Sequence, residues 1–269
     1  IVSHTEVTLS RGQIKGFMLV WPAGDEERRT RVLARMQQSF QRLEGVLDPA
    51  QVTDAGQGVD LVSGLAVRQP RANASGFFVA ASGAVVTTAE AVAGCTRITL
   101  DGVHEARVVA TDPEFGIALL TPEDRIAPRG IAALRTDAPR RQSEIAVAGY
   151  PFGGVLSAPT LTFGTLEDLQ GLRGETQLRR LALAAAAGDA GGPVLDAGGS
   201  VLGMLLPPQA TGGQVLPPNV TFAAEAGRIS ALMREAGLTA ARGNGSGTLA
   251  PEDLTTRAAN MTVFVSCWE

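Results

Sequence analysis

The chain has little of several residue types on which common function classes depend. Its 269 residues include two histidines, two cysteines, 4% aromatic residues and a single lysine, Lys15. Two distant histidines leave no cluster of the ligands that transition metals prefer, so we expect no metal site and no cofactor. The formal net charge of −4 argues against a nucleic-acid partner. No window of about 18 consecutive apolar residues is present, so no transmembrane segment is expected.

No signal peptide is visible at the start of the sequence. The chain opens at Ile1 in what reads as the middle of a domain. We therefore expect sequence upstream of Ile1 to be missing, and a targeting segment to be unobservable for that reason.

Residues 1–48 show two strand patterns followed by a helix pattern. Residues 5–9 alternate polar and apolar, and residues 15–21 form an apolar run. From Asp25 to Leu43 apolar positions recur at helical spacing, with acidic residues in the first turn. We interpret residues 1–48 as the C-terminal remainder of a small α/β domain. Residues 49–74 read as a connector, with one short helix near residues 60–65.

From Ser75 onward, short apolar segments recur at close intervals between Gly, Asp and Pro. This rhythm predicts an all-β barrel or sandwich. Helical spacing follows over residues 224–236, and Gly237 can cap that helix. Residues 238–269 read as a Gly- and Ser-rich loop followed by a closing C-terminal strand over residues 261–267.

The two cysteines, Cys95 and Cys267, fit one disulfide bond. The alternative is two buried free thiols. A disulfide favours an oxidising compartment, so we expect a periplasmic or secreted protein.

Several strings resemble bacterial trypsin-like serine proteases in order and spacing. They are SGFFV at residues 75–79, VVTTAEAV at 85–92, ATDPEFGIALL at 110–120, GYPFG at 149–153, FGTL at 163–166 and GDAGGPV at 188–194. The resemblance implies a mainly β, two-β-barrel trypsin-like fold over residues 75–237, preceded by the partial α/β segment.

A serine protease needs a histidine, an aspartate and a serine acting together. This sequence departs from the family at all three aligned positions, which are Glu90, Gly116 and Ala190. Ala190 has no nucleophilic atom, Glu90 replaces the imidazole, and Gly116 removes the orienting carboxylate. The resemblance therefore implies a pseudoprotease that binds and does not cut.

Two alternatives stay open for catalysis. One is an active serine-type endopeptidase with a relocated nucleophile, Ser75 or Ser157, and Glu90 as its base. The other is a base supplied by one of the two histidines, of which His104 reads as a surface or strand histidine and His4 lies in the N-terminal segment.

The resemblance also implies a retained oxyanion-hole-like backbone over Gly188, Asp189 and Ala190, with the N–H groups of residues 188 and 190 directed into a hole. A peptide groove would then lie between residues 187–192 and 201–206. The alternative is a tight glycine-rich turn kept for folding alone. We expect a module of the cell envelope that binds a protein or peptide or has a structural role. A subunit of a larger assembly is one form that this module could take.

Overall fold

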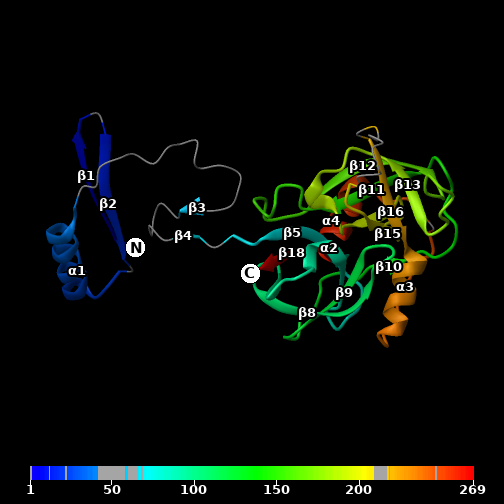
Figure 1. Ribbon diagram of the computed structural model, residues 1–269, viewed down its shortest axis with the longest axis horizontal. Coiled ribbons are helices and arrows are strands. Elements are labelled where there is room, and N and C mark those ends of the chain that lie inside the picture. The colour runs from blue at the N-terminus through cyan, green and yellow to red at the C-terminus, as the bar shows by residue number, and fades with distance from the viewer. Residues whose placement is uncertain are drawn as a thin grey trace. The chain divides into compact units, whose positions relative to one another are not determined.

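The computed structural model describes residues 2–11, 13–21, 23–41, 58–59, 66–67, 69–208, 217, 219–245 and 247–269. The chain divides into two compact units, Ile1–Gln69 and Pro70–Glu269 (Figure 1). Within the first unit, β3 (Gly58–Val59) pairs with β4 (Ala66–Val67). The short helix expected near residues 60–65 lies outside the described residues.

The N-terminal unit contains the two strands and the helix that the sequence predicts. Strand β1 (Val2–Ser10) pairs antiparallel with β2 (Gln13–Trp21), and α1 (Glu26–Ser39) follows. The helix begins after Asp25, whose side chain accepts a hydrogen bond from the Arg28 N–H at 3.3 Å. The predicted order of strand, strand and helix is therefore confirmed, and the interpretation of residues 1–48 as the remainder of a larger α/β domain stays a prediction.

The first barrel is a closed ring of six strands in the order β18-β5-β6-β9-β8-β7. The strands are β5 (Ala72–Phe78), β6 (Val85–Thr88), β7 (Arg97–Leu100), β8 (His104–Asp112), β9 (Ile117–Pro122) and β18 (Thr262–Trp268). A short helix, α2 (Ala89–Val92), follows β6 directly. Apolar side chains such as Leu100 and Leu120, both fully buried, fill the ring.

The second barrel is also closed. Its strands follow the order β14-β11-β12-β13-β16-β15, and β14 pairs with β15 to complete the ring. They are β11 (Glu144–Gly149), β12 (Thr160–Asp168), β13 (Leu178–Ala182), β14 (Pro193–Asp196), β15 (Val201–Leu205) and β16 (Val220–Glu225). Two short strands, β10 (Ala133–Leu134) and β17 (Ala241–Arg242), extend the sheet beyond β15. The predicted two-barrel, mainly β fold is confirmed.

The C-terminal residues correct the expected domain boundary. Residues 238–269 were predicted to lie outside the double barrel, but β18 is a strand of the first barrel and pairs with both β5 and β7. Helix α4 (Pro251–Met261), which the sequence pattern did not predict, leads into it. The trypsin-like unit therefore runs from Pro70 to Glu269 and is not complete at residue 237.

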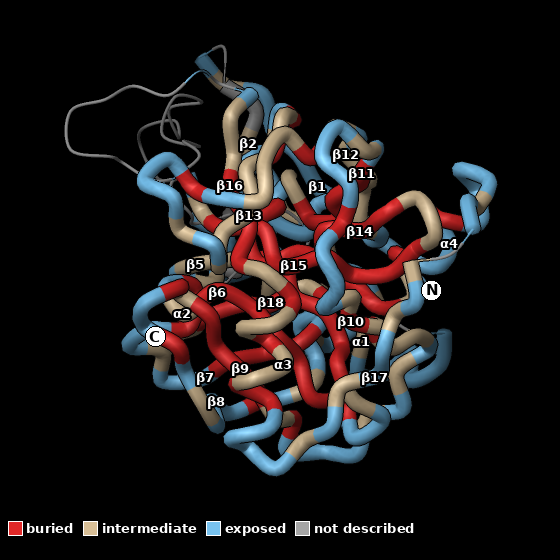
Figure 2. Tube along the Cα trace, turned by 90° about the vertical axis from the view of Figure 1, so that its right-hand side faces the viewer, coloured by how far each residue is buried: buried red, intermediate tan, exposed pale blue. Residues whose placement is uncertain are grey.

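Helix α3 (Ala226–Glu235) agrees with the predicted helix. It buries Ile229, Leu232 and Met233 against the core that the two barrels share. Gly237 then adopts a φ of +76°, as a helix-ending glycine does. Figure 2 shows that the barrel strands carry most of the buried residues, whereas the loops that join them are exposed.

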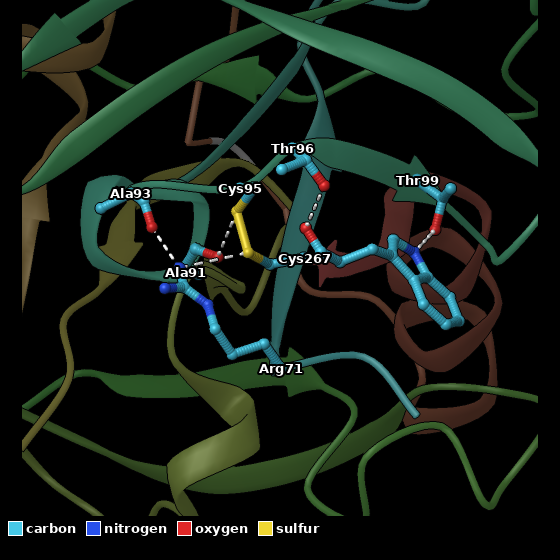
Figure 3. The surroundings of a disulfide bond; sticks show 8 residues. Arg71, Ala91, Ala93, Cys95, Thr96, Thr99 and Cys267 are labelled. Carbon is cyan, nitrogen blue, oxygen red and sulfur yellow. Dashed lines mark hydrogen bonds between the residues drawn. A yellow bond between two sulfur atoms is a disulfide. The ribbon is translucent and has the colours of Figure 1, made fainter. Parts of the chain in front are cut away.

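The predicted disulfide joins Cys95 to Cys267, with 5.3 Å between their Cα atoms (Figure 3). It ties the end of β18 to the segment before β7. Beside it, the Arg71 N–H donates to the Cys267 carbonyl at 2.7 Å, and the Trp268 indole N–H donates to the Thr99 hydroxyl at 2.9 Å. These contacts fix the last strand on both sides.

None of the helices described here is both long enough and apolar enough to cross a membrane.

Candidate functional site

Two of the three expected catalytic positions meet at the end of the first barrel. Glu90 lies on α2, with its side chain exposed, and Gly116 lies in the turn between β8 and β9. The Ala89 N–H donates to the Gly116 carbonyl at 2.8 Å, so the chain segments that carry both positions are in contact.

The third position joins them through β5. The Ser75 N–H donates to the Ala190 carbonyl at 2.9 Å, and the Thr87 hydroxyl donates to the Ser75 carbonyl at 2.7 Å. Hydrogen bonds therefore link the segment that carries position 90 to position 116 and, through Ser75 of β5, to position 190. The side chains at these three positions are a carboxylate, a hydrogen atom and a methyl group.

Gly116 adopts a φ of +63°, in the left-handed region. A Cβ at this position would meet no atom within 4 Å, so space does not exclude a side chain there. The backbone conformation does disfavour one, because L-residues adopt it only at a cost of about 1 kcal/mol or more. The turn at 116 is therefore shaped around glycine.

The turn before Ala190 differs from the expected oxyanion-hole arrangement. Residues 187–189 form a 3₁₀ turn, in which the Ala190 N–H donates to the Ala187 carbonyl at 3.2 Å. That N–H was expected to point into a hole, yet here it closes the turn. The turn satisfies this N–H within the chain, and a residue distant in the sequence holds the turn: the Ser75 hydroxyl donates to the Gly188 carbonyl at 2.7 Å.

Asp189 is the last residue of this turn and is only 2% exposed. One carboxylate oxygen accepts from the Ala186 N–H at 2.9 Å, and Oδ1 has no hydrogen-bond partner among the described residues. Burial raises the pKa of Asp189, and the Ala186 N–H offsets part of that rise. A buried, half-satisfied carboxylate is costly, which marks this turn as a place that is not optimised for stability alone.

The proposed replacement nucleophiles lie in two different settings. Ser75 is fully buried, and its hydroxyl both donates to Gly188 and accepts from the Tyr150 N–H at 2.8 Å. It is committed to structure. Ser157 is exposed and lines a cavity together with His104 and Asp101. Over the described ranges, no hydrogen bond joins Ser157 to His104, or Glu90 to either serine.

His4 lies on β1 in the N-terminal unit, 3.9 Å from the Glu6 carboxylate. Groups of three or more side chains able to hold a metal ion are absent from the part of the chain that the structure describes.

Residues 74–204 match the family model described as the trypsin-like peptidase domain. This range contains most strands of both barrels and all three expected catalytic positions. The chain carries a trypsin-like peptidase domain. The resemblance inferred from the sequence motifs is confirmed at the level of family and fold.

Relatives of the trypsin-like domain include proteins named as serine proteases. The chain is 30% identical over 204 residues to the uncharacterized protein y4bJ of Sinorhizobium fredii, covering 72% of this chain and 32% of that protein. It is 27% identical to the serine protease Rv3671c of Mycobacterium tuberculosis, covering 63% of this chain and 43% of the relative. The chain thus spans less than half the length of these relatives.

Solved structures of similar fold support the same conclusion for the fold alone. One is described as the Rv3671c protease in an inactive form, with a TM-score of 0.50, 24% identity and coverage of 63% of this chain and 86% of that one. Another is the serine endoprotease of Yersinia pestis, with a TM-score of 0.51, 18% identity and coverage of 62% and 58%.

Proposed function

We propose that the trypsin-like domain is a pseudoprotease, a non-catalytic module that binds a protein or peptide partner or serves as a structural part of a larger assembly. The observation that carries this proposal is Ala190. It stands in the motif GDAGGP, its backbone lies against β5 where the nucleophile segment belongs, and its methyl group offers no atom for acyl transfer.

The surroundings of Ala190 point the same way. Removing the serine from a comparable triad lowers turnover by a factor of about 10⁶. What remains in such enzymes comes from the oxyanion hole and substrate binding. Here the Ala190 N–H donates to Ala187 within a 3₁₀ turn, so even that residual contribution is reduced in the observed conformation.

The test compares purified protein with the variant Ala190→Ser. Both are incubated with a fluorophosphonate probe and with unfolded casein. We expect no labelling and no cleavage by the wild-type protein. Labelling of the wild-type protein at a stoichiometry near one, mapped to a single residue, would overturn the proposal.

A second candidate is favoured by one specific observation, the shared cavity of Ser157, His104 and Asp101. A hydrolase that used Ser157 with His104 would be labelled by the same probe, and Ser157→Ala would abolish that labelling. Retained labelling in Ser157→Ala, or none in the wild type, would remove this candidate.

We also propose that the protein works in the periplasm or outside the cell. The disulfide between Cys95 and Cys267 supports this, because structural disulfides persist in oxidising compartments. Cell fractionation of the native host, read with an antibody, tests it; recovery with the cytosolic fraction would contradict it.

A further inference from the structure

The trypsin-like domain contains a cavity that is separate from the three expected catalytic positions. Its volume is about 720 Å³, within the range of small-molecule sites. The cavity is bounded by the β7–β8 turn, residues 126–129, residues 154–159, the end of α4 and β18. Glu90, Gly116 and residues 187–190 are not among its lining residues.

Tyr150 and Thr262 are buried polar residues in the lining of this cavity, and the Thr262 hydroxyl already donates to the Ala258 carbonyl at 2.8 Å. Only 8% of Tyr150 is exposed, and its ring packs edge-on against Phe264, with 5.3 Å between the ring centroids. Its hydroxyl has no hydrogen-bond partner within the residues that the structure covers. Because Tyr150 lines the cavity, this hydroxyl is available to a ligand there.

The hydroxyl of Tyr150 is a donor at neutral pH. Burial raises its pKa to about 12, and the nearby Asp101 carboxylate contributes to that rise. The proton therefore stays on the oxygen, and the group offers a hydrogen bond to an acceptor.

Most other polar side chains around the cavity are also donors. They are the guanidinium of Arg129, the amide of Asn260, the ring of His104 and the hydroxyl of Ser157. The donors lie on several elements, and one of them is a guanidinium. Such a set suits a carboxylate, because charge-assisted hydrogen bonds are the stronger kind.

Asp101 is the single acidic side chain of this cavity. It is held at the edge of β18, where its carboxylate accepts from the Phe264 N–H at 2.9 Å and its own N–H donates to the Phe264 carbonyl at 2.8 Å. Burial raises the pKa of Asp101, while the Phe264 N–H and His104 offset part of that rise. This carboxylate already has partners in the protein, whereas the Tyr150 hydroxyl has none.

The remaining walls of the cavity are apolar. They include Phe78, Leu100, Ile126, Leu156 and Phe264. Leu156 is 46% exposed, so an apolar ligand would cover it.

From these contacts we propose that this cavity binds an apolar ligand that carries one carboxylate, with Tyr150 and Arg129 as the groups that hold the carboxylate. Two sources share this chemistry: a polypeptide C-terminus that ends in an apolar residue, and a free apolar carboxylic acid. The site is additional to the old catalytic cleft, and it does not depend on whether that cleft is inert.

The test measures binding of a fluorescein-labelled pentapeptide ending in leucine to the full chain by fluorescence polarisation. The matched probe is the same peptide with a C-terminal amide. We expect the acid to bind at least tenfold more tightly than the amide. Tyr150→Phe, which removes only the oxygen, should weaken the acid about fivefold and leave the melting temperature nearly unchanged.

Two charge-removing variants test whether the bound group of the ligand is negatively charged. Arg129→Gln should weaken binding of the acid about tenfold, whereas Asp101→Asn, which keeps an acceptor for the Phe264 N–H, should strengthen it about twofold to fivefold. Circular dichroism confirms that each variant is folded.

Competition distinguishes the two sources. Displacement of the labelled peptide by N-acetyl-leucine at similar affinity supports a free carboxylic acid, and displacement only by longer peptides supports a polypeptide C-terminus. Equal binding of acid and amide would overturn the proposal. So would the reversed pattern, in which Arg129→Gln strengthens binding and Asp101→Asn weakens it.

Discussion

At the scale of single residues, the backbone at positions 116 and 190 bears on whether a triad could be restored. Gly116 adopts a φ of +63°, in a region that aspartate enters more readily than most L-residues, as Asp25 and Asp101 do in this chain. The Ala190 N–H is bonded within its own turn. Restoring three side chains would therefore leave the Ala190 N–H bonded to the Ala187 carbonyl in the observed conformation.

We expect the triple variant Glu90→His, Gly116→Asp, Ala190→Ser to remain inactive, without fluorophosphonate labelling or casein cleavage. Recovery of labelling in the triple variant would show that the turn rearranges readily.

We expect Gly116→Ala alone to lower the free energy of unfolding by about 1 kcal/mol, because the cost lies in the φ angle and not in space. Urea titration measures this value.

Asp189 gives a prediction in pH. Its pKa in the folded protein is raised above its ordinary value of 3.8 by burial, so the folded state binds this proton more readily than the unfolded state. Stability from this group is therefore greatest when it is protonated and falls as pH rises through the raised pKa.

The comparison for Asp189 is with Asp189→Asn, which cannot ionise. The difference in free energy of unfolding, wild type minus variant, should decrease as pH rises from about 4 to 7, measured by urea titration at each pH. A difference that is constant with pH, or increases, would contradict the assignment.

Motif positions could be predicted from the sequence, but bond directions could not. The string GDAGGPV assigned Ala190 to the position that the serine occupies in the family. Whether its N–H faces a hole or the Ala187 carbonyl depends on contacts with Ser75 and Tyr150, which lie far away in the chain. The same holds for the cavity at Tyr150, whose lining comes from five separate segments.

At the scale of elements, β18 closes the first barrel by pairing with β5 and β7. The sequence predicted a closing strand from the apolar residues 261–267, and it predicted the disulfide. The boundary at residue 237 failed because a pattern does not show which sheet a strand joins. Helix α4 was missed, although Pro251 at its start, two acidic residues in its first turn and buried Leu254 and Ala258 four residues apart are usual helix signals.

The disulfide should stabilise this element strongly. It closes a loop with a sequence separation of 172 residues, for which chain entropy suggests about 5 kcal/mol, and native contacts reduce the observed value. We expect Cys95→Ser with Cys267→Ser to lower the free energy of unfolding by about 3–5 kcal/mol in urea titration.

Reducing agent provides the control for the disulfide. It should destabilise the wild-type protein by a similar amount and leave the double serine variant unchanged. If the double variant and the wild type unfold at the same urea concentration, β18 is held by its strand pairing alone.

At the scale of the whole molecule, every strand of both barrels comes from Pro70–Glu269. We therefore expect a chain that begins at Pro70 to keep the melting temperature of the trypsin-like domain within about 2 °C, measured by calorimetry or circular dichroism. A variant ending at residue 237 provides the contrast, because it lacks β18 and should not fold cooperatively. Loss of folding in the chain that begins at Pro70 would show that the N-terminal unit supports the barrels.

Because β18 is the last strand of the chain, the first barrel cannot close until that strand has been synthesised. A growing polypeptide presents β5 to β9 first, yet their ring stays open until the whole second barrel has been translated. At roughly 5–20 residues per second, the 172 positions that separate Cys95 from Cys267 take about 10–30 s to synthesise. During that interval Cys95 is a free thiol. The edges of β5 and β7 that pair with β18 are exposed to chaperones and to neighbouring chains. The earliest barrel to emerge is thus the latest to be sealed.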